Sequence, residues 1–442
     1  MNNEDQDTGL RRELTLLDST MINAGSMIGS GIFIVPASIA LALHSSSLVV
    51  LAWVAGGIVS LFGALSMAEL GALMPRAGGQ YVYLREAYSP LVGFLYGWTA
   101  FAVINTASIA AVAVTSATYL GYFFPLNPVA IKVVAIASIL LLTLINCFGV
   151  KLGAIVQNVF TLSKIGTLAV LALLSFILSG GSVNNFSPVL PTLPFTTLAG
   201  PFAIAMVAVL WSYDGWIEIT YVAGEVLNPQ RNLPRSLILS TAIVIVSYVA
   251  INLGFIYVLS LDTMSRSTLV AADSATAIFG AAGASVVALA VIVSTIGANN
   301  GFIFTCPRIY YAMAKEGLFF GWLAHVNAKY QTPVPALVAQ AVIAIVLIST
   351  GSFDELTTYV VFASWIFYAM SCSALFILRM RSPNAARPYS AWGYPFTPIV
   401  FILFAVWLVW SSIADSPADA LIGLGIIFMG IPAYIFWKRK SG

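Results

Sequence analysis

Long apolar runs alternate with short polar connections along almost the whole of the 442-residue chain. A helix that crosses a bilayer needs about 20 predominantly apolar residues, because each residue adds only about 1.5 Å along the helix axis. About twelve segments meet this requirement, and they predict an all-α membrane protein. The predicted spans lie near residues 17–43, 48–73, 89–120, 129–149, 156–179, 198–226, 235–260, 284–311, 334–350, 356–378, 395–413 and 418–437.

Two of these spans contain clustered small and polar residues. The first span carries the run Gly29–Gly31, and the sixth carries Ser212, Asp214, Gly215 and Glu218 in its middle. A glycine inside a helix costs about 1 kcal/mol relative to alanine. Backbone freed from its helix at membrane depth is tolerated only against protein or a water-filled cavity. We therefore predict that the first and sixth helices are unwound.

The two predicted breaks are five spans apart. Interrupted spans at matching positions of two halves indicate a transporter built from inverted repeats, with its binding site near the membrane midplane. No residue-level repeat is visible, so this symmetry rests on the breaks and the topology. The predicted organisation is a tail at 1–16 and one transmembrane domain at 17–437. Its repeats cover about 17–179 and 198–378, and two extra helices cover about 395–437.

The composition leaves no room for a soluble domain of any size. Charged residues make up 8% of the chain, against about 25% in soluble domains. The three cysteines, Cys147, Cys306 and Cys372, fall in or beside predicted spans and imply no disulfide framework. The two histidines, His44 and His325, form no metal cluster, and no nucleotide-binding loop is present. We expect no cofactor, no metal, no nucleic-acid partner and no enzyme activity.

Positive charge is concentrated in alternate loops. These loops hold Arg11, Arg12, Arg76, Arg85, Lys151, Arg231, Arg235, Arg308, Lys315, Lys329, Arg379, Arg381, Arg387, Lys438, Arg439 and Lys440. The opposite loops hold only Lys132 and Arg266, together with several acids. Lysine and arginine in short loops favour the cytoplasmic side. The pattern predicts a cell-membrane protein with an even number of spans and both termini in the cytoplasm.

The break in the first span predicts a site for a zwitterion. If one half-helix stops near Ile28 and another starts near Ile32, the free N–H groups of Ser30, Gly31 and Ile32 can bind a carboxylate. The unpaired carbonyls of the preceding half-helix can accept hydrogen bonds from an ammonium group. The alternative is a helix-packing face formed by Gly25 and the small residues after it. The second break favours the binding site.

The second break, at Trp211–Trp216, can complete such a site. Its carbonyl groups can contact the ammonium, and Trp211 can cover the ligand as a gate. An acid inside a membrane span, such as Asp214, is a functional candidate by default. Alternatively, Asp214 caps the N–H groups of Trp216 and Ile217 and keeps the break open. The sequence leaves both roles possible.

Other polar residues inside spans are further candidates. Lys164, in the fifth span, is predicted to be a fixed ammonium in the place of a sodium ion, or a proton-linked group; the alternative is a salt bridge with an acid. Asn105, Tyr248, Asn299 and Asn300 can line the pocket or form interhelical hydrogen bonds. Glu69 and Glu225, near the cytoplasmic face, are expected to pair with arginines and close the inner side.

Several runs of residues then resemble the amino acid–polyamine–organocation superfamily. They are Met27–Phe33 with Pro36, Glu69–Gly71 with Pro75, Gly78 and Tyr81, Gly224–Val226 with Asn228–Arg235, and Arg308 with Tyr311 and Gly317. Within that superfamily, Trp211–Trp216 and Asn300–Phe304 resemble the L-type amino-acid transporter family, as a bacterial-like member. The resemblance covers about residues 10–390 in order.

This resemblance implies a LeuT-type fold, with two inverted five-helix repeats plus two helices, and sodium-independent exchange of L-amino acids by alternating access. The family's carboxylate-binding backbone falls on Ser30, Gly31 and Ile32, and its ammonium-binding carbonyls fall on Met27, Ile28, Trp211 and Asp214. Trp211 corresponds to the gate and Lys164 to the family's fifth-helix lysine. Ser212 and Gly215 belong to the same predicted site.

Two departures from the family pattern matter. The loop near 121–129 has no cysteine, so we expect no disulfide-linked heavy subunit. An acid at position 214 is not shared by every relative, which leaves the charge of the substrate open. The leading prediction is exchange of neutral L-amino acids. The alternatives are a proton-coupled amino-acid symporter, and a cationic amino-acid or polyamine antiporter with Asp214 as counter-charge.

Overall fold

The protein is built from helices packed side by side. A computed structural model describes residues 9–178, 180–189, 194–350 and 353–441. In these residues nine helices are long and apolar enough to cross a membrane, and two further apolar helices, Thr197–Ser212 and Val334–Thr350, are shorter. Apart from an isolated bridge between Leu14 and Val226, the described chain forms no β-structure. The predicted all-helical membrane architecture is confirmed.

The helices follow the predicted spans closely. Their bounds are α1 Leu16–Met27, α2 Gly31–Ile34, α3 Pro36–Leu43, α4 Ser46–Leu73, α5 Gln80–Ala87, α6 Pro90–Thr99, α7 Asn105–Leu120, α8 Pro128–Cys147, α9 Val150–Ile177, α10 Phe195–Ser212, α11 Pro229–Val258, α12 Leu261–Arg266, α13 Val270–Phe279, α14 Gly283–Thr305, α15 Pro307–Lys315, α16 Val334–Thr350, α17 Phe353–Arg381, α18 Phe396–Asp415 and α19 Pro417–Ser441. The π-helical turn η2, Ala100–Ile104, joins α6 to α7.

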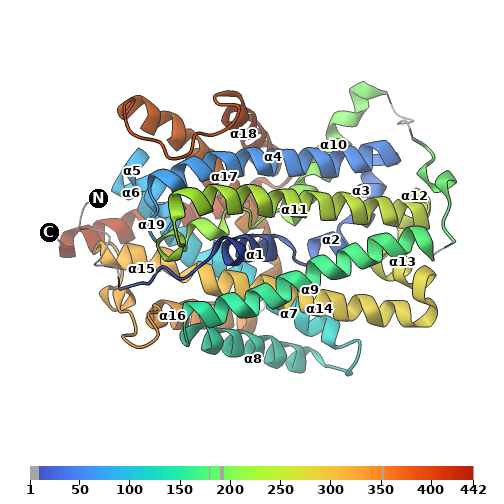
Figure 1. Ribbon diagram of the computed structural model, residues 1–442, viewed down its shortest axis with the longest axis horizontal. Coiled ribbons are helices and arrows are strands. Elements are labelled where there is room, and N and C mark those ends of the chain that lie inside the picture. Colours follow the sequence, from blue (N-terminus) through green and yellow to red (C-terminus); the bar gives the residue numbers. More distant parts are fainter. Residues whose placement is uncertain (1–8, 179, 190–193, 351–352, 442) are drawn as a thin grey trace.

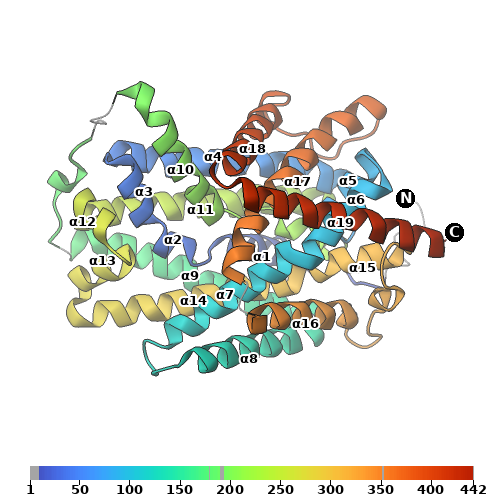
Figure 2. The ribbon, with the colours of Figure 1, turned by 180° about the vertical axis from the view of Figure 1, so that it is seen from behind.

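The long helices run along the long axis of the molecule, and both ends of the described chain lie at the same end of it (Figure 1). We call this the termini end. The short helices α12 and α13 lie at the opposite end. The interrupted helix α1–α2 lies in the middle, where α1 packs against α9, α11 and α14. Seen from behind, α19 runs along the outside of the bundle near α6 (Figure 2).

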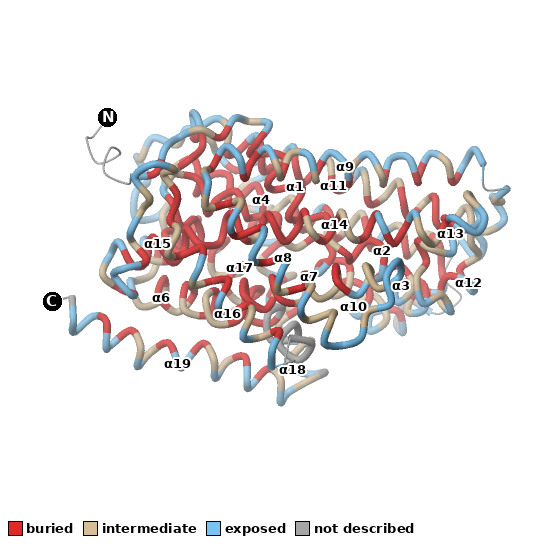
Figure 3. Tube along the Cα trace, turned by 90° about the horizontal axis from the view of Figure 1, so that it is seen from below, coloured by how far each residue is buried: buried red, intermediate tan, exposed pale blue. Residues whose placement is uncertain are grey.

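Burial is concentrated around the interrupted helix. Figure 3 shows buried residues along α1 and the facing sides of its neighbours, whereas α19 alternates between buried and exposed residues. Large apolar side chains such as Leu141, Val159 and Val246 are more than half exposed on the outer faces. A lipid environment explains this exposure, because hydrocarbon solvates such side chains as well as a protein core does.

Several elements differ from simple spans. The short helices α5, α12 and α13 form in segments that the sequence analysis treated as connections. The third span contains the π turn η2, a feature that accommodates one extra residue per turn and is often found at functional sites. The eighth span is divided at Pro307, which lacks the N–H that a continuous helix requires.

Ion pairs with buried carboxylates lie near the termini end. The carboxylate of Glu225 accepts hydrogen bonds of 2.7 and 2.9 Å from the guanidinium of Arg308, and both side chains are buried. Glu69 pairs with Arg379 at 2.5 Å and with Arg387 at 3.4 Å. The predicted pairing of Glu69 and Glu225 with arginines is confirmed. The carbonyl of Glu225 also accepts from the backbone N–H of Leu14 at 3.0 Å, which ties the N-terminal segment to this end.

We predict that Arg308→Ala strongly destabilises the protein. Removing one partner of a buried ion pair leaves an uncompensated charge, which costs about 3–5 kcal/mol. Denaturant unfolding in detergent micelles should show this decrease in the free energy of unfolding. The matched control is Arg266→Ala, which removes an exposed pair with Asp262 and should cost less than about 1 kcal/mol. Equal stability losses in the two variants would contradict the prediction.

Candidate functional site

The first span is interrupted between α1 and α2. The helix α1 ends at Met27, Ile28 has extended backbone angles, and α2 begins at Gly31. The backbone N–H groups of Ser30, Gly31 and Ile32 donate to no backbone carbonyl among the described residues. These three donors therefore stay available at the start of a helix, where the helix dipole also favours negative charge.

The sixth span is interrupted after α10. The helix ends at Ser212, and a short 3₁₀ turn, η4, begins at Glu218. Gly215 lies between them with a φ of +97°, a backbone conformation that other residues rarely adopt. A Cβ atom at Gly215 would lie 2.9 Å from the carbonyl carbon of Ser26. The two breaks are therefore in direct backbone contact.

Two side chains join the breaks. The hydroxyl of Tyr248, on α11, lies 3.0 Å from the carbonyl oxygens of both Met27 and Ser212. The amide of Asn23, on α1, donates to the carbonyl of Trp216 at 2.9 Å and accepts from the N–H of Ile219 at 3.2 Å. These bonds satisfy backbone groups that would otherwise be unpaired in a region without bulk water.

Lys164 reaches the first break from α9. Its ammonium donates to the carbonyl oxygens of Gly25 at 2.7 Å and Ile28 at 2.8 Å, and the side chain is buried. The hydroxyl of Ser294 lies 3.1 Å from the Ile28 carbonyl and 2.9 Å from that of Gly29. No carboxylate of the described chain forms an ion pair with Lys164. The salt bridge considered as an alternative is thus not formed there.

A cavity of about 70 Å³ lies where the breaks meet. One water needs about 10–15 Å³ measured in this way, so the cavity has room for several waters or a small ligand. Its lining residues are Ser26, Met27, Gly29, Ser30, Gly31, Ser108, Ala111, Val112, Trp211, Ser212, Asp214, Ala298 and Phe302. Trp211 is 37% exposed, whereas the residues of both breaks are largely buried.

The cavity brings six predicted site residues together, namely Met27, Ser30, Gly31, Trp211, Ser212 and Asp214. The predicted residues Ile28, Ile32 and Gly215 do not line it. The side chains of Ile28 and Ile32 are fully buried, and Gly215 packs against Ser26 behind the cavity.

Asp214 lies between this cavity and a second, smaller one. Its carboxylate accepts a 2.7 Å hydrogen bond from the hydroxyl of Tyr368, on α17. The smaller cavity is also lined by Asn105 and Glu218, and Glu218 accepts a hydrogen bond from Thr305. The Asp214 carboxylate thus has a hydrogen-bond partner on α17. This partner favours a contact between helices over the alternative role, in which Asp214 caps the N–H groups of Trp216 and Ile217.

The remaining candidates lie outside the main cavity. The side chain of Asn300 donates to Gln157 at 2.7 Å and accepts from Asn146 at 2.9 Å, which links α14 to α9 and α8. Tyr248 joins the breaks, as described above. Asn299 is buried, and its side-chain oxygen has no hydrogen-bond partner within the described chain.

Comparison with known proteins places this arrangement in a family. A family model described as amino acid permease matches residues 14–431, nearly the whole chain. The chain belongs to the amino acid permease family. The resemblance inferred from the sequence motifs is thereby confirmed, and the family is one of transporters rather than enzymes.

The similar permeases cover the full length of the chain. The b(0,+)-type amino acid transporter 1 of Mus musculus is 34% identical over 98% of this chain and 90% of its own length. The serine/threonine exchanger SteT of Bacillus subtilis (strain 168) is 32% identical over 99% of both chains. The large neutral amino acids transporter small subunit 2 of Mus musculus is 31% identical over 98% of this chain and 82% of its own length.

Sequence reasoning missed the apolar wall residues Ala111, Val112 and Ala298 of this permease site. It also missed Asn23 and Ser294, which bond to the breaks, Tyr368, which bonds to Asp214, and Phe302, which lines the cavity. Asn23 was detectable, because an amide in an apolar span needs a partner. For Tyr368 and Phe302 no signal was available, because aromatic residues are common on helices throughout the chain.

We predict that alanine has different effects at two glycines of this site. Gly215→Ala should prevent stable folding, because it adds an atom 2.9 Å from the backbone of Ser26 at a positive φ. A Cβ atom at Gly29 meets nothing within 4 Å, so Gly29→Ala should fold normally. Because Gly29 lines the cavity, the added methyl group takes up space there, and the variant should bind substrate several-fold more weakly. The yield of monodisperse protein and radioligand binding measure the two effects. Normal folding of Gly215→Ala would contradict the close contact between the breaks.

Proposed function

We propose that this permease is a sodium-independent exchanger of L-amino acids, with neutral amino acids as the main substrates. It works by alternating access in the cell membrane, and both termini lie in the cytoplasm. The observation that carries this proposal is the meeting of two helix breaks at one cavity. N–H groups without a backbone partner in the described chain and carbonyl oxygens that can accept a further hydrogen bond lie beside the same small space, and a zwitterion needs both.

The proposed substrate lies across the first break. Its carboxylate accepts from the N–H groups of Ser30, Gly31 and Ile32. Its ammonium donates to carbonyl groups of Met27, Ile28 and Trp211 and contacts Asp214. The carbonyls of Met27 and Ile28 already accept from Tyr248 and Lys164, but each carbonyl oxygen has two lone pairs and can accept again.

We propose twelve membrane crossings in a LeuT-type arrangement. The nine long helices and the two shorter ones supply eleven, and the interrupted segment α1–α3 supplies the twelfth. The repeats then comprise about 17–179 and 198–378, and α18 and α19 lie outside them. The common position of both ends of the described chain supports an even number of crossings (Figure 1), and the loop lysines and arginines favour the cytoplasmic side for that end.

Alternating access requires the cavity to open to one side at a time. In this structure the termini end is closed by the pairs of Glu225 with Arg308 and of Glu69 with Arg379. Trp211 stands at the cavity with more than a third of its surface exposed, so we assign it as the gate on the opposite side. Opening to the cytoplasm then requires the ion pairs at the termini end to separate.

We assign Lys164 as a permanent substitute for a bound cation. A sodium ion in a transporter of this type is held by carbonyl and hydroxyl oxygens beside an unwound helix, and the Lys164 ammonium occupies such a place. It contacts two carbonyls of the first break, and the hydroxyl of Ser294 contacts one of them. A positive charge that is part of the chain makes an external cation unnecessary.

We predict that Lys164→Ala slows transport more than it weakens substrate binding. The variant removes the Lys164 donor from the carbonyl of Gly25 and leaves the carbonyl of Ile28 with Ser294 alone, so the break changes conformation less readily. Counterflow rates and equilibrium binding in proteoliposomes separate the two effects. The control Lys132→Ala removes a partly exposed lysine whose hydrogen bond within the described chain is to the Ser349 carbonyl, and it should leave both unchanged. Unaltered transport by Lys164→Ala at every pH would refute the assignment.

The mode of transport is tested with radiolabelled amino acids in proteoliposomes. Uptake of labelled serine, threonine or leucine should require unlabelled amino acid in the lumen and should be independent of sodium. Equal uptake into empty vesicles under a pH gradient would instead establish proton symport. Asp214 lines the cavity, and this observation favours a cationic amino-acid or polyamine antiporter as the second candidate. Competition by lysine or putrescine that disappears in Asp214→Asn would establish it.

We also propose that the carrier acts without a disulfide-linked partner. The connection between α7 and α8 contains no cysteine, and the three cysteines of the chain lie within or beside helices. One relative is named a small subunit, but this chain lacks an exposed thiol in that connection for a covalent link.

A further inference from the structure

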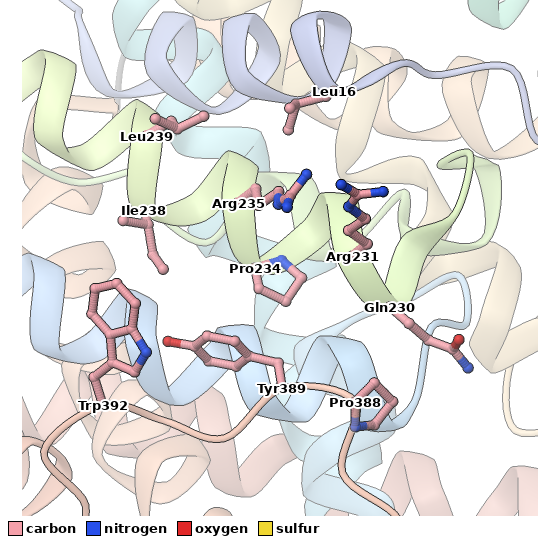
Figure 4. Close-up of a pocket in the computed structure, with 10 residues that line it drawn as sticks. All are labelled: Leu16, Gln230, Arg231, Pro234, Arg235, Ile238, Leu239, Pro388, Tyr389 and Trp392. Atoms are coloured by element: carbon pink, nitrogen blue, oxygen red, sulfur yellow. The ribbon is translucent and has the colours of Figure 1, made fainter.

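A second and larger cavity lies on the side of the bundle, away from the proposed substrate site. This lateral groove has a volume of about 770 Å³. Its walls come from α1, the first turns of α11 and the segment 382–395 that joins α17 to α18 (Figure 4). The groove is at the termini end, because α11 begins there (Figure 1).

Two arginines that line the groove have no partner among the residues that the structure describes. Arg231 and Arg235 are both exposed, and neither forms an ion pair or side-chain hydrogen bond with a described residue. They lie four residues apart on α11, so their guanidinium groups repel each other on one helix face. They also lie in its first two turns, where the helix dipole disfavours positive charge. An anion between them removes both costs.

Apart from Gln230, the other residues of the groove are apolar or amphipathic. Leu239 is 45% exposed and Trp392 is 66% exposed, and Leu16 of α1 forms the opposite wall. Figure 4 shows the rings of Tyr389 and Trp392 facing α11 across the groove. A small hydrophilic anion would leave these surfaces uncovered, whereas an amphiphile covers them.

The spacing of charge and apolar surface matches a lipid. From Arg231 to Leu239 the helix rises by about 12 Å, since each residue adds about 1.5 Å. The wall of the groove that α11 forms therefore extends from the level of the lipid headgroups into the region of the acyl chains. Tryptophan is enriched at that boundary, as at position 392, and basic pockets between helices on the cytoplasmic side bind anionic headgroups.

We propose that the lateral groove is a binding site for an anionic phospholipid. The phosphate lies between Arg231 and Arg235, and one acyl chain lies along Leu239 and Trp392. The lipid then connects α1, α11 and the segment 382–395. This proposal is independent of the transported substrate, since the groove shares no residue with the cavity at the helix breaks.

The test compares lipid retention by native mass spectrometry of the full chain, purified with phosphatidylglycerol or phosphatidylcholine. The wild type should retain one phosphatidylglycerol, and the double variant Arg231→Gln/Arg235→Gln should retain it at least tenfold more weakly. The control Arg439→Gln/Lys440→Gln removes the same amount of charge from exposed residues that also lie at the termini end of the molecule. It should behave as the wild type. A circular dichroism spectrum and elution volume equal to those of the wild type ensure that the double variant is folded.

Four outcomes would overturn the proposal. Equal retention of phosphatidylcholine would show that the site does not select an anion. An equal loss in the control variant would show a general surface-charge effect. Displacement of the lipid by millimolar inorganic phosphate would identify a site for a soluble anion. A tenfold gain in retention on deletion of residues 2–8, which include Glu4, Asp5 and Asp7, would identify the acidic N-terminal segment as the occupant.

Discussion

The structure depends on how backbone hydrogen-bonding groups are satisfied where two helices are interrupted. In hydrocarbon each unpaired N–H or C=O costs several kcal/mol, so a break survives only if protein or ligand groups replace the lost bonds. Here the Lys164 ammonium and the hydroxyls of Tyr248 and Ser294 supply donors to the carbonyls of the first break. The N–H groups of Ser30, Gly31 and Ile32 have no such partner in the described backbone. The unsatisfied part of the first break is thus the part proposed to bind the substrate carboxylate.

The same requirement explains the neighbouring sequence. The two breaks approach so closely that Gly31 and Gly215 have no room for a side chain, since a Cβ atom at Gly31 would lie 2.7 Å from the Ser212 hydroxyl. Asn23 and Tyr248 then bond to backbone atoms of both segments. Movement of one break therefore disturbs the hydrogen bonds of the other, which suits a site that changes conformation as a unit.

Much of this arrangement could be predicted from the sequence, because the membrane imposes strong patterns. The spans were visible as apolar runs, and the breaks were visible because glycine and acid residues are costly inside such runs. The partners of those residues were not visible. Tyr368 meets Asp214 from a helix 154 positions away, and no local pattern reports which face of α17 points inward. The π turn at 100–104 and the lateral groove likewise arise only from the packing of distant segments.

The proposed role of Lys164 as a fixed cation has a consequence for the energetics of transport. A sodium ion that binds and dissociates with the substrate transfers the free energy of its gradient to the substrate. A cation that is covalently attached to α9 returns with the protein in every cycle and transfers none. In the proposed exchanger the direction of flow then follows only from the amino-acid concentrations on the two sides. Such a carrier can change the composition of the cell's amino-acid pool, but it leaves the total number of molecules in that pool unchanged.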